Sequence, residues 1–463
     1  MNSANNGAEN CIVSPTPPVV KEELAHVAAG LRLLENPTAY LSELREKYGD
    51  TFLVDVFGFQ LFCVFSNTAL ENFYKLPEDQ ASFGLATFDL MGFKTPSEIF
   101  ADAMPNLFYK LLTLKQVNSY IADIIDVVDL EIDRLGEAGE FEIFDQIRTL
   151  EQRIGYRLWI GEEASSEQYW IKLKQNFDVL DQEKAFVDPA SVLETIKTGK
   201  QKERAAVAEI AAIIDEIWAQ RQVSGAGGED TLHLMHQLFD DEDKTLENRK
   251  VAHNTINANQ GFLSNLYAAI AWCTVHVVSN GEVAQAVLTD IAVAREKYGE
   301  DFLLQLDAIN EMDYIEQLLM ESVRVAQRSI TLRKVMQEVT LNDGQREYTV
   351  APGAYITTLL SVTNFQPPGL EGFDPNHYTK NKLTADLGGF AKESVTTFGH
   401  GSHSCPAQRL SHIVTKVVLC KLLINFDLDA QFTHAEPSRV QLGGVARSEQ
   451  PCVVNYRRRV VGQ

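Results

Sequence analysis

Helical periodicity dominates the middle of this 463-residue chain and restricts its possible folds more than any other feature. Between about residues 105 and 325, apolar residues recur at i, i+3, i+4 and i+7, the spacing that lines one face of an α-helix. The clearest segments are VNSYIADIIDVVDLEIDRL (117–135), RAAVAEIAAIIDEIWAQR (204–221), GFLSNLYAAIAWCTVHVV (261–278) and YIEQLLMESVRVAQ (314–327). The turn-forming segments VSGAGGEDT and SNGE interrupt this region. We therefore predict a mainly helical body.

Strand-like sequences lie on either side of this helical region. TFLVDVFG (51–58) and LFCVFS (61–66) flank a turn at Gly58 and predict a hairpin, which follows a predicted helix over 36–50. Further strands are predicted in TLRKVM (331–336), EYTVAPGAYITTLL (347–360) and PCVVNYRR (451–458), and the segment YRRRVV is typical of a charged edge strand. Apolar periodicity over 407–428 predicts one more long helix. The predicted fold class is mainly α with small β-sheets.

Composition favours one soluble, globular domain, since 45% of the residues are hydrophobic and 23% are charged. No Pro/Gly/Ser linker divides the chain, so we expect a flexible arm over residues 1–20 and a single domain over 21–463. The formal net charge of −23 disfavours nucleic acid as a partner. Six scattered cysteines predict reduced thiols and a cytoplasmic location. Because no apolar window of about 18 residues is evident, we expect neither a signal peptide nor a membrane anchor.

The segment TTFGHGSHSC (396–405) concentrates glycines, histidines and a cysteine just before the last long helix. A zinc site built from His400, His403 and Cys405 is one interpretation, but structural zinc needs four ligands and no second Cys/His pair lies nearby. The alternative is a loop that presents the Cys405 thiolate, since amides and dipole at a helix N-terminus favour an anionic sulfur. Glycines such as Gly399 would let a flat cofactor approach the backbone closely.

FGHGSHSCPA is similar to the cysteine-ligand loop of cytochrome P-450 enzymes, F-x-x-G-x-[R/H]-x-C-x-[G/A]. The matching positions are Phe398, Gly401, His403, Cys405 and Ala407. About eighty residues upstream, Glu321 and Arg324 in ESVR resemble the family's E-x-x-R pair, whose burial requires saturated hydrogen bonds. FDPNHY resembles the family's F-x-P-x-R-F segment, with His377 where arginine is common; an imidazole can still make one bond to the Glu321 network.

The resemblance extends over nearly the whole chain and implies the cytochrome P-450 fold, a triangular prism of helices with a small β region. It implies heme b as cofactor, with the Cys405 thiolate as the axial ligand of the iron. The other heme contacts that it implies are Phe398, Gly399, His403 and Arg333, with the last two holding propionates, and Lys110 or Lys115 as a further cation.

The predicted distal helix departs from the family pattern A-G-x-[D/E]-T. Counting back from SNGE places Ser264 and Asn265 where the acid and the threonine would stand. Aligned on NANQG, the helix instead resembles the sterol and prostanoid branch or the plant branch that metabolises hydroperoxides. In either register a polar stripe remains, formed by Asn254, Asn257, Gly261 and Ser264 with Gln260 and Asn265 at its margin. These groups are either satisfied structural amides or, at Asn257, Gly261, Ser264 and Asn265, catalytic groups that orient a substrate or water.

The leading functional hypothesis is a soluble, monomeric monooxygenase that hydroxylates or epoxidises a small apolar, lipid- or steroid-like substrate with O2. A ferredoxin- or flavodoxin-type donor would dock near Arg409, Lys416 and Lys421. The segment FGLATFDLMGFKTPSEIF (83–100) is a candidate for substrate recognition. The absent acid–threonine pair favours an alternative, a peroxygenase or a hydroperoxide or endoperoxide lyase or isomerase that needs no reductase. A noncatalytic heme-binding protein is the third hypothesis.

Overall fold

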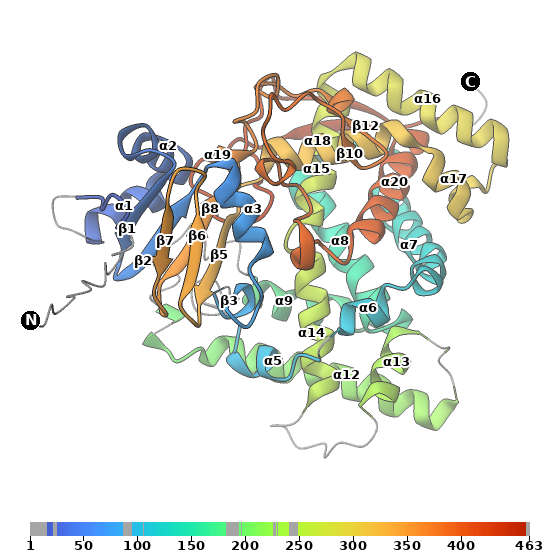
Figure 1. Ribbon diagram of the computed structural model, residues 1–463. Helices are drawn as coiled ribbons and strands as arrows, with labels where there is room; N and C mark the ends of the chain where they lie inside the picture. Colours follow the sequence, from blue (N-terminus) through green and yellow to red (C-terminus); the bar gives the residue numbers. More distant parts are fainter. Residues whose placement is uncertain are drawn as a thin grey trace, which may run out of the picture.

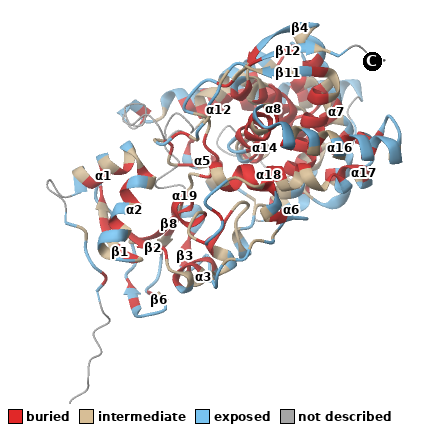
Figure 2. Ribbon diagram, turned by 90° about the horizontal axis from the view of Figure 1, so that it is seen from above, coloured by how far each residue is buried: buried red, intermediate tan, exposed pale blue. Residues whose placement is uncertain are grey.

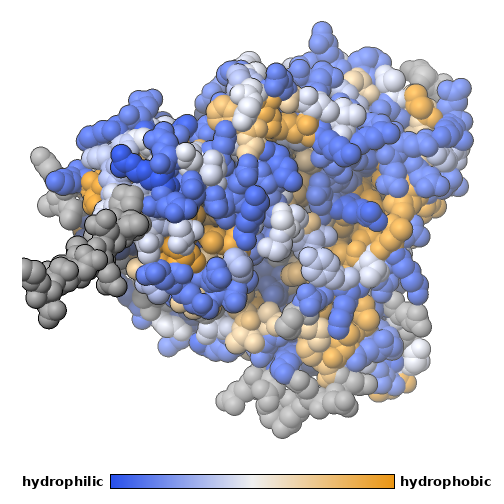
Figure 3. Space-filling model, viewed as in Figure 1, coloured by the Kyte–Doolittle hydropathy of each residue, from blue (hydrophilic) through white to orange (hydrophobic). Residues whose placement is uncertain are grey.

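The structure is a computed structural model in which a smaller, sheet-containing lobe lies beside a larger helical body (Figure 1). It describes residues 16–21, 26–86, 95–104, 106–181, 194–195, 197–225, 228, 230–239 and 249–459. The candidate recognition segment 83–100 falls partly outside this range, at residues 87–94. Most of the visible surface is hydrophilic, with separate apolar patches between (Figure 3).

The sheet-containing lobe begins with the elements α1 (His26–Glu35), α2 (Pro37–Tyr48), β1 (Thr51–Val56), β2 (Phe59–Val64), α3 (Asn67–Lys75) and β3 (Ala81–Ser82). Asn36 caps α2, because its side chain accepts a hydrogen bond of 3.0 Å from the Ala39 amide. β1 and β2 pair antiparallel across Phe57 and Gly58, whose φ angles of 53° and 92° suit a tight hairpin turn. The predicted helix and hairpin are therefore confirmed.

Strands from far along the chain complete this sheet, whose order is β1-β2-β8-β5-β3. β8 (Tyr355–Leu359) pairs parallel with β2, and β5 (Ile330–Val335) pairs antiparallel with β8. The hairpin β6 (Val339–Asn342) and β7 (Glu347–Val350) and the short pair β9 (Tyr378–Thr379) and β10 (Lys382–Leu383) lie outside the sheet. β5 matters most for the site, because it carries Arg333.

The helical body contains the following helices: α5 (Ser97–Ala101), α6 (Leu107–Leu111), α7 (Leu114–Leu135), α8 (Ile143–Trp159), α9 (Trp170–Leu180), α12 (Gln201–Ser224), α13 (Thr231–Leu238), α14 (Lys250–Leu263), α15 (Leu266–Ser279), α16 (Gly281–Tyr298), α17 (Leu306–Glu311), α18 (Asp313–Ala326) and α20 (Gln408–Asn425). The short helix α19 (Leu360–Thr363) follows β8 and packs against α2 in the sheet-containing lobe (Figure 1). Much of α8, α14 and α18 is buried inside the body (Figure 2). The prediction of a mainly helical body with small sheets is confirmed.

Two sequence-based expectations about strands need correction. The first three residues of the predicted charged edge strand, 456–458, belong to β12 (Val453–Arg458), which lies between β11 (Phe426–Ala430) and β4 (Ala138–Glu142) and is therefore not an edge strand. Residues 460–461 of that segment lie outside the described range. The end of the predicted N-terminal arm also pairs with the sheet. Leu53 donates a hydrogen bond to the Pro18 carbonyl and accepts one from the Val20 amide, both at 2.8 Å. Residues 1–15 lie outside the described range.

One helical stretch, Lys250–Ser279, is long and apolar enough to cross a membrane by length and composition, with a mean hydropathy of 1.4 over its best window. The expectation that no such window exists is therefore wrong. This stretch comprises α14 and α15, and 67% of the window is buried among the other helices. The five described cysteines are free, as predicted.

Candidate active site

The loop before α20 turns back on itself and presents Cys405. Gly399 and Gly401 adopt φ angles of 78° and 60°, a region that favours glycine. A Cβ atom on Gly399 would lie 2.4 Å from the His403 carbonyl oxygen, so no larger residue fits there without a shift. The Cys405 amide donates a hydrogen bond of 2.6 Å to the Phe398 carbonyl and closes the loop. The sequence argument for glycine at these positions is thus supported by the backbone.

The Cys405 sulfur is set apart from the other described thiols by its access and its bonds. The other four described cysteines are buried, whereas Cys405 is partly accessible. The backbone amides of Ala407 and Gln408, at the start of α20, donate hydrogen bonds to its side chain. Burial raises the pKa of the Cys405 thiol, and these two hydrogen bonds act in the opposite direction. A metal cation at the sulfur would stabilise the thiolate further.

The zinc interpretation of this loop is not supported. No group of three His, Cys, Asp or Glu side chains in the described part of the chain could hold a metal ion. The His400 ring nitrogen Nε2 lies 3.0 Å from the Val395 carbonyl oxygen, and the ring packs edge-on against Tyr74. These contacts give His400 a structural role in the loop.

Arg333 and His403 are the two predicted propionate-binding residues of the site, and only Arg333 is a buried cation. Arg333 is 1% exposed, and its Nη1 donates to the carbonyls of Leu76 and Ala81 at 2.7 and 3.1 Å. Its Nη2 is buried and has no hydrogen-bond partner among the described residues. The charge of Arg333 reaches His403, whose pKa is lowered first by burial and then by this guanidinium. A buried cation with an unused donor suits the carboxylate of a propionate.

Glu78 is a neighbour that sequence reasoning missed. Its Oε2 lies 3.4 Å from His403 Nε2, too poorly aligned to count as a hydrogen bond for the imidazole. Burial would raise the pKa of Glu78, but hydrogen bonds from Ser82, Gly84 and Phe83 keep it below its ordinary value. No pattern in the sequence marks this position, because the contact joins segments more than 300 residues apart.

The structure gives different support to Phe398 and Lys110 as predicted heme contacts. Phe398 is half-buried, and its ring centroid lies 5.6 Å from that of His412 on α20. Lys110 is exposed on α6, and its Nζ lies 3.9 Å from the Met104 sulfur. Lys115 is also exposed. No contact is recorded between either lysine and Arg333 or His403 in the described part of the chain, so their predicted role stays a prediction.

The central helix breaks at Ser264 and Asn265, where the sequence predicted one continuous helix. Gly261, Ser264 and Asn265 are exposed, whereas Phe262 and Leu266 beside them are buried. This face of the helix therefore borders a space rather than packed side chains. A Cβ atom on Gly261 would meet only Phe108, at 4.0 Å. The three predicted residues thus share one open face.

Asn265 connects the break between α14 and α15 to the loop that contains Gly444 and Val445. Its Oδ1 accepts a hydrogen bond of 2.9 Å from the Val445 amide, and its Nδ2 donates one of 2.9 Å to Ser264 Oγ. Gly444 allows this approach, because a Cβ there would lie 2.5 Å from Asn265 Oδ1. The Ser264 hydroxyl also lies 3.4 Å from the Gly261 carbonyl. The hydrogen bond between Asn265 and Val445 joins residues 180 positions apart, and no local sequence pattern predicts it.

The remaining members of the polar stripe separate into different roles. Asn254 is fully buried and bonds to the Met104 amide and to the carbonyls of Asp102 and Lys250, at 2.8–2.9 Å. It is a structural amide, as the more conservative interpretation expected. Gln260 is part-buried and bonds to Thr95, whereas Asn257 is half-buried. The predicted stripe is therefore not a single functional surface.

The predicted Glu321–Arg324 pair is fully buried and saturated. The carboxylate accepts from Arg324 Nε and Nη2 at 2.8 and 2.6 Å. Arg324 also donates to the carbonyls of Asn364, Leu370 and Gly372. His377 Nδ1 lies 3.1 Å from Glu321 Oε1, the single bond expected of an imidazole here. This network anchors the segment that leads from β8 toward the cysteine loop.

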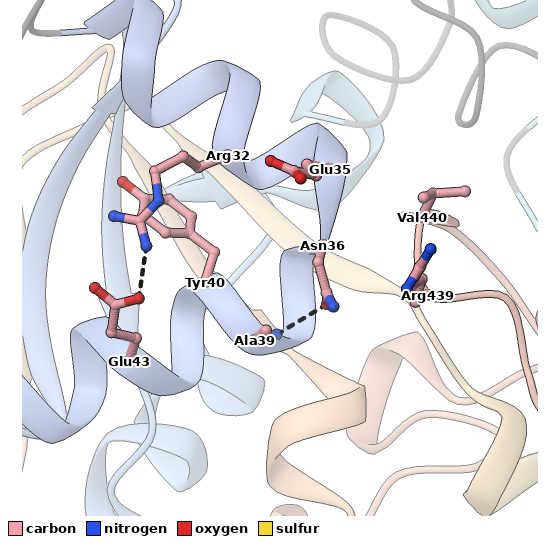
Figure 4. Close-up of a pocket in the computed structure, with 8 residues that line it drawn as sticks. All are labelled: Arg32, Glu35, Asn36, Ala39, Tyr40, Glu43, Arg439 and Val440. Atoms are coloured by element: carbon pink, nitrogen blue, oxygen red, sulfur yellow. Dashed lines mark hydrogen bonds and ion pairs between the residues drawn. The ribbon is translucent and has the colours of Figure 1, made fainter.

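One surface pocket, bordered by α1, α2, Arg439 and Val440, is separate from this site (Figure 4). Its lining residues are held to one another, as in the ion pair of 2.6 Å between Arg32 and Glu43. It contains no thiol and no residue of the cysteine loop or the central helices.

The arrangement fits a heme better than any other group considered. An accessible sulfur receives two amide hydrogen bonds, a buried guanidinium keeps one donor unused, and glycine backbone permits a close approach. Such a group, when bound, supplies oxygen activation through an iron whose thiolate ligand favours O–O cleavage.

Comparison with known proteins agrees with this geometry. A profile of the family "Cytochrome P450" matches residues 21–456. The chain is similar to the cytochrome P450 monooxygenase prhD of Penicillium brasilianum, with 24% identity over 75% of this chain and 70% of the relative. It is 20% identical to the human 24-hydroxycholesterol 7-alpha-hydroxylase over 96% of this chain and 94% of that enzyme. It is 21% identical to the Arabidopsis thaliana sterol 14-demethylase, over 89% and 86%. The chain therefore belongs to the cytochrome P450 family and is a monooxygenase that binds heme b through the Cys405 thiolate.

Proposed function

We propose that this monooxygenase hydroxylates or epoxidises an apolar, lipid- or steroid-like molecule with O2 and two electrons from a separate protein. The accessible, amide-bonded sulfur of Cys405 is the observation that carries the proposal, because it suits a thiolate ligand to iron. The substrate class is supported by relatives whose names specify sterols.

The chain's own part in this reaction lies at the helix break. Asn265 donates its amide hydrogen to Ser264 Oγ, so the Ser264 hydroxyl hydrogen is available to the Gly261 carbonyl or to a molecule in the adjoining space. Neutral donors and acceptors at this position can orient a water molecule or an oxygenated substrate group. The smallness of Gly261 leaves room for that molecule beside the helix.

A peroxygenase, lyase or isomerase acting on hydroperoxides or endoperoxides is the second candidate. It is favoured by one observation, the neutral pair Ser264 and Asn265 at the break where the family commonly has an acid and a threonine. Such reactions begin from a substrate that already contains an O–O bond and need no external electrons.

The expected docking of a ferredoxin- or flavodoxin-type donor requires revision. Lys416 is 1% exposed and bonds to the Ile309 carbonyl and Glu316, so its prediction as a docking cation is wrong. Lys421 pairs with Asp129 at 2.7 Å, and Arg409 is exposed. We propose that such a donor meets the Cys405 side through Arg409. We still propose a soluble protein, which the burial of much of α14 and α15 supports, whereas its monomeric state and cytoplasmic location stay predictions.

The spectrum of the reduced protein with carbon monoxide tests the cofactor assignment. The red-shifted band of a thiolate-ligated heme should appear in the wild type and in Cys452→Ala, and should vanish in Cys405→Ala. Its absence from folded, heme-loaded wild type would contradict the proposal.

Turnover assays then separate the two reactions. A panel of sterols and fatty acids is incubated with a donor pair and NADPH, and separately with hydrogen peroxide or a fatty-acid hydroperoxide. Product that depends on NADPH and O2 supports the leading proposal. Product formed only with peroxides would overturn it in favour of the second candidate.

A further inference from the structure

Glu151 on α8 stands apart from the other buried carboxylates. The described residues contain four buried acidic side chains, namely Glu131, Glu151, Glu203 and Glu321. Glu131 and Glu321 pair with arginines, and Glu203 accepts a hydrogen bond from Thr195. Glu151 is 1% exposed, and neither of its carboxyl oxygens has a hydrogen-bond partner within the part of the chain that the structure describes. A lone buried carboxylate is costly, so this group is held as a neutral acid or solvated by internal water.

The packing of α8 places Glu151 behind the helix break. The Phe144 ring meets Trp272 with centroids 5.4 Å apart, and Arg148 lies over the Tyr267 ring at 5.6 Å. Farther along α8, Gly155 meets the end of α14, since a Cβ there would lie 2.5 Å from Asn259 Oδ1. Residue numbers therefore rise along α8 as they fall along α15 and α14, so α8 runs antiparallel to the two central helices. Residue 151, between 148 and 155, therefore stands at the level of residues 263–266.

Further polar groups without partners among the described residues lie at the interface of α8 with α14 and α9. Thr255 and Asn259 on α14 are 0% exposed, and the Thr255 hydroxyl and both polar atoms of the Asn259 amide lack hydrogen-bond partners. The buried Tyr156 hydroxyl on α8 also lacks a partner, and the Tyr156 ring stacks on Phe177 of α9 with centroids 5.3 Å apart. Buried polar groups almost always have partners, and ordered water supplies them where protein does not. Unmet polar groups on two facing helices therefore indicate internal water along this interface.

The contacts of α8 with α9 and with Asp181, the residue after α9, lead to the surface. Arg148 forms an ion pair with Asp181, and Gln152 donates a hydrogen bond of 2.8 Å to Asp178. The side chains of Asp178 and Asp181 are 38% and 21% exposed. Arg148 and Asp181 are also the charged groups that act on Glu151. Burial is the main influence and raises the pKa of Glu151 well above its ordinary value.

We propose that Glu151 relays protons from solvent to the distal side of the helix break, a task for which the break itself has no acid. The O–H bond of the Glu151 carboxyl breaks as its proton passes to water in the α8–α14 interface. The resulting carboxylate regains a proton from solvent along the Asp178–Asp181 side. A helix end leaves backbone carbonyls without intrahelical partners, and these can bind the water that crosses the break. The inference rests on the O2-dependent reaction proposed above, which consumes two protons for each O2.

Infrared spectroscopy tests the acid itself and needs no turnover. The difference spectrum between wild type and Glu151→Gln should contain the carbonyl band of a protonated carboxylic acid, and that band should shift when H2O is replaced by D2O. A carboxylate band, or a carbonyl band that does not shift over hours, would overturn the relay.

Turnover in two modes tests the proton transfer. Glu151→Gln should lose about tenfold of its NADPH- and O2-driven product, while product driven by hydrogen peroxide, which carries its own protons, should change by less than about twofold. Glu151→Asp should recover part of the loss. Glu203→Gln, a second buried acid outside the interface, is the matched control and should change neither mode.

Equal loss in both modes, or no loss in either, would overturn the relay. If the wild type forms product with peroxide alone, the O2-dependent function fails. The infrared result then still decides whether Glu151 is a protonated group in contact with solvent.

Discussion

The buried pair Glu321 and Arg324 illustrates at the residue scale why a short motif can be structural. Both charged side chains are fully buried. Arg324 donates hydrogen bonds to three backbone carbonyls, and the His377 ring contacts the Glu321 carboxylate. Such a pair can add little net stability over apolar residues, but the loss of one partner leaves the other charge buried and unpaired.

Removal of one partner of this pair should therefore destabilise the folded protein strongly. We expect Arg324→Ala to lower the free energy of unfolding by about 3–5 kcal/mol, measured by chemical denaturation of the heme-loaded protein. The exposed pair of Arg295 with Glu300 provides the control, and Arg295→Ala should have little effect. Similar small effects from both variants would contradict the burial of this network.

Glu151 makes the stability depend on pH in a defined direction. Its pKa in the folded state is raised by burial above its value in the unfolded chain, near 4.3. As pH rises above that value, the unfolded chain loses this proton while the folded protein retains it, so stability falls with rising pH.

Glu151→Gln removes this dependence. The free energy of unfolding of the variant relative to the wild type should rise as pH increases above about 4.3, with a limiting slope of about 1.4 kcal/mol per pH unit while Glu151 stays protonated in the folded protein. A melting curve at each pH measures it, with Glu203→Gln as the control. A stability difference between variant and wild type that does not change between pH 4 and pH 7 would contradict the assignment.

At the scale of elements, the cysteine loop depends on backbone that only glycine supplies without strain. Gly399→Ala should reduce heme incorporation several-fold, measured as the ratio of heme to protein, because the new Cβ meets the His403 carbonyl. Gly136→Ala is the matched control, since Gly136 has a similar φ of 72° but open space around it. Its cost should be limited to about 1 kcal/mol of backbone strain. Equal heme content in both variants would contradict the close approach.

The helix break is likewise an interaction between elements. Asn265→Ala removes the acceptor for the Val445 amide, so that amide should exchange with D2O at least tenfold faster, as measured by hydrogen-exchange mass spectrometry. Asn257→Ala, on the same helix without a recorded link to this loop, should leave the exchange unchanged. Unchanged exchange in Asn265→Ala would show that other contacts hold the loop.

The features that the sequence did not predict depend on contacts between residues that lie far apart in the chain. Helices and the β1–β2 hairpin arise from local periodicity and turn residues, and they were predictable. The break at Ser264 and Asn265 was not predictable, because the apolar pattern continues across it. Val445, which bonds to Asn265, lies 180 residues away in the sequence. Lys416 was placed on the surface because lysine is usually exposed, whereas Glu316 and a carbonyl solvate it inside. Cys405, Arg333 and His403 were found through a family motif rather than through periodicity.

At the scale of the whole molecule, the net charge of −23 sets the long-range interaction with an electron donor. An acidic donor is repelled until it reaches Arg409, so its electron-transfer rate should rise as salt screens the repulsion. Stopped-flow reduction between 20 mM and 200 mM salt measures this, and a basic donor should show the opposite trend. A rate that falls with salt for an acidic donor would show that local cations dominate.

The parallel pairing of β2 with β8 also has a consequence for synthesis on the ribosome. β2 ends at Val64 and β8 begins at Tyr355, so the first strands emerge long before their partner exists. At ordinary rates of translation this interval lasts roughly 15–60 s. During it the free edge of β2 can pair with another nascent chain. The sheet that holds Arg333 can thus close only after three quarters of the protein has been made, so chaperones that shield the free edge of β2 during synthesis should raise the yield of folded enzyme.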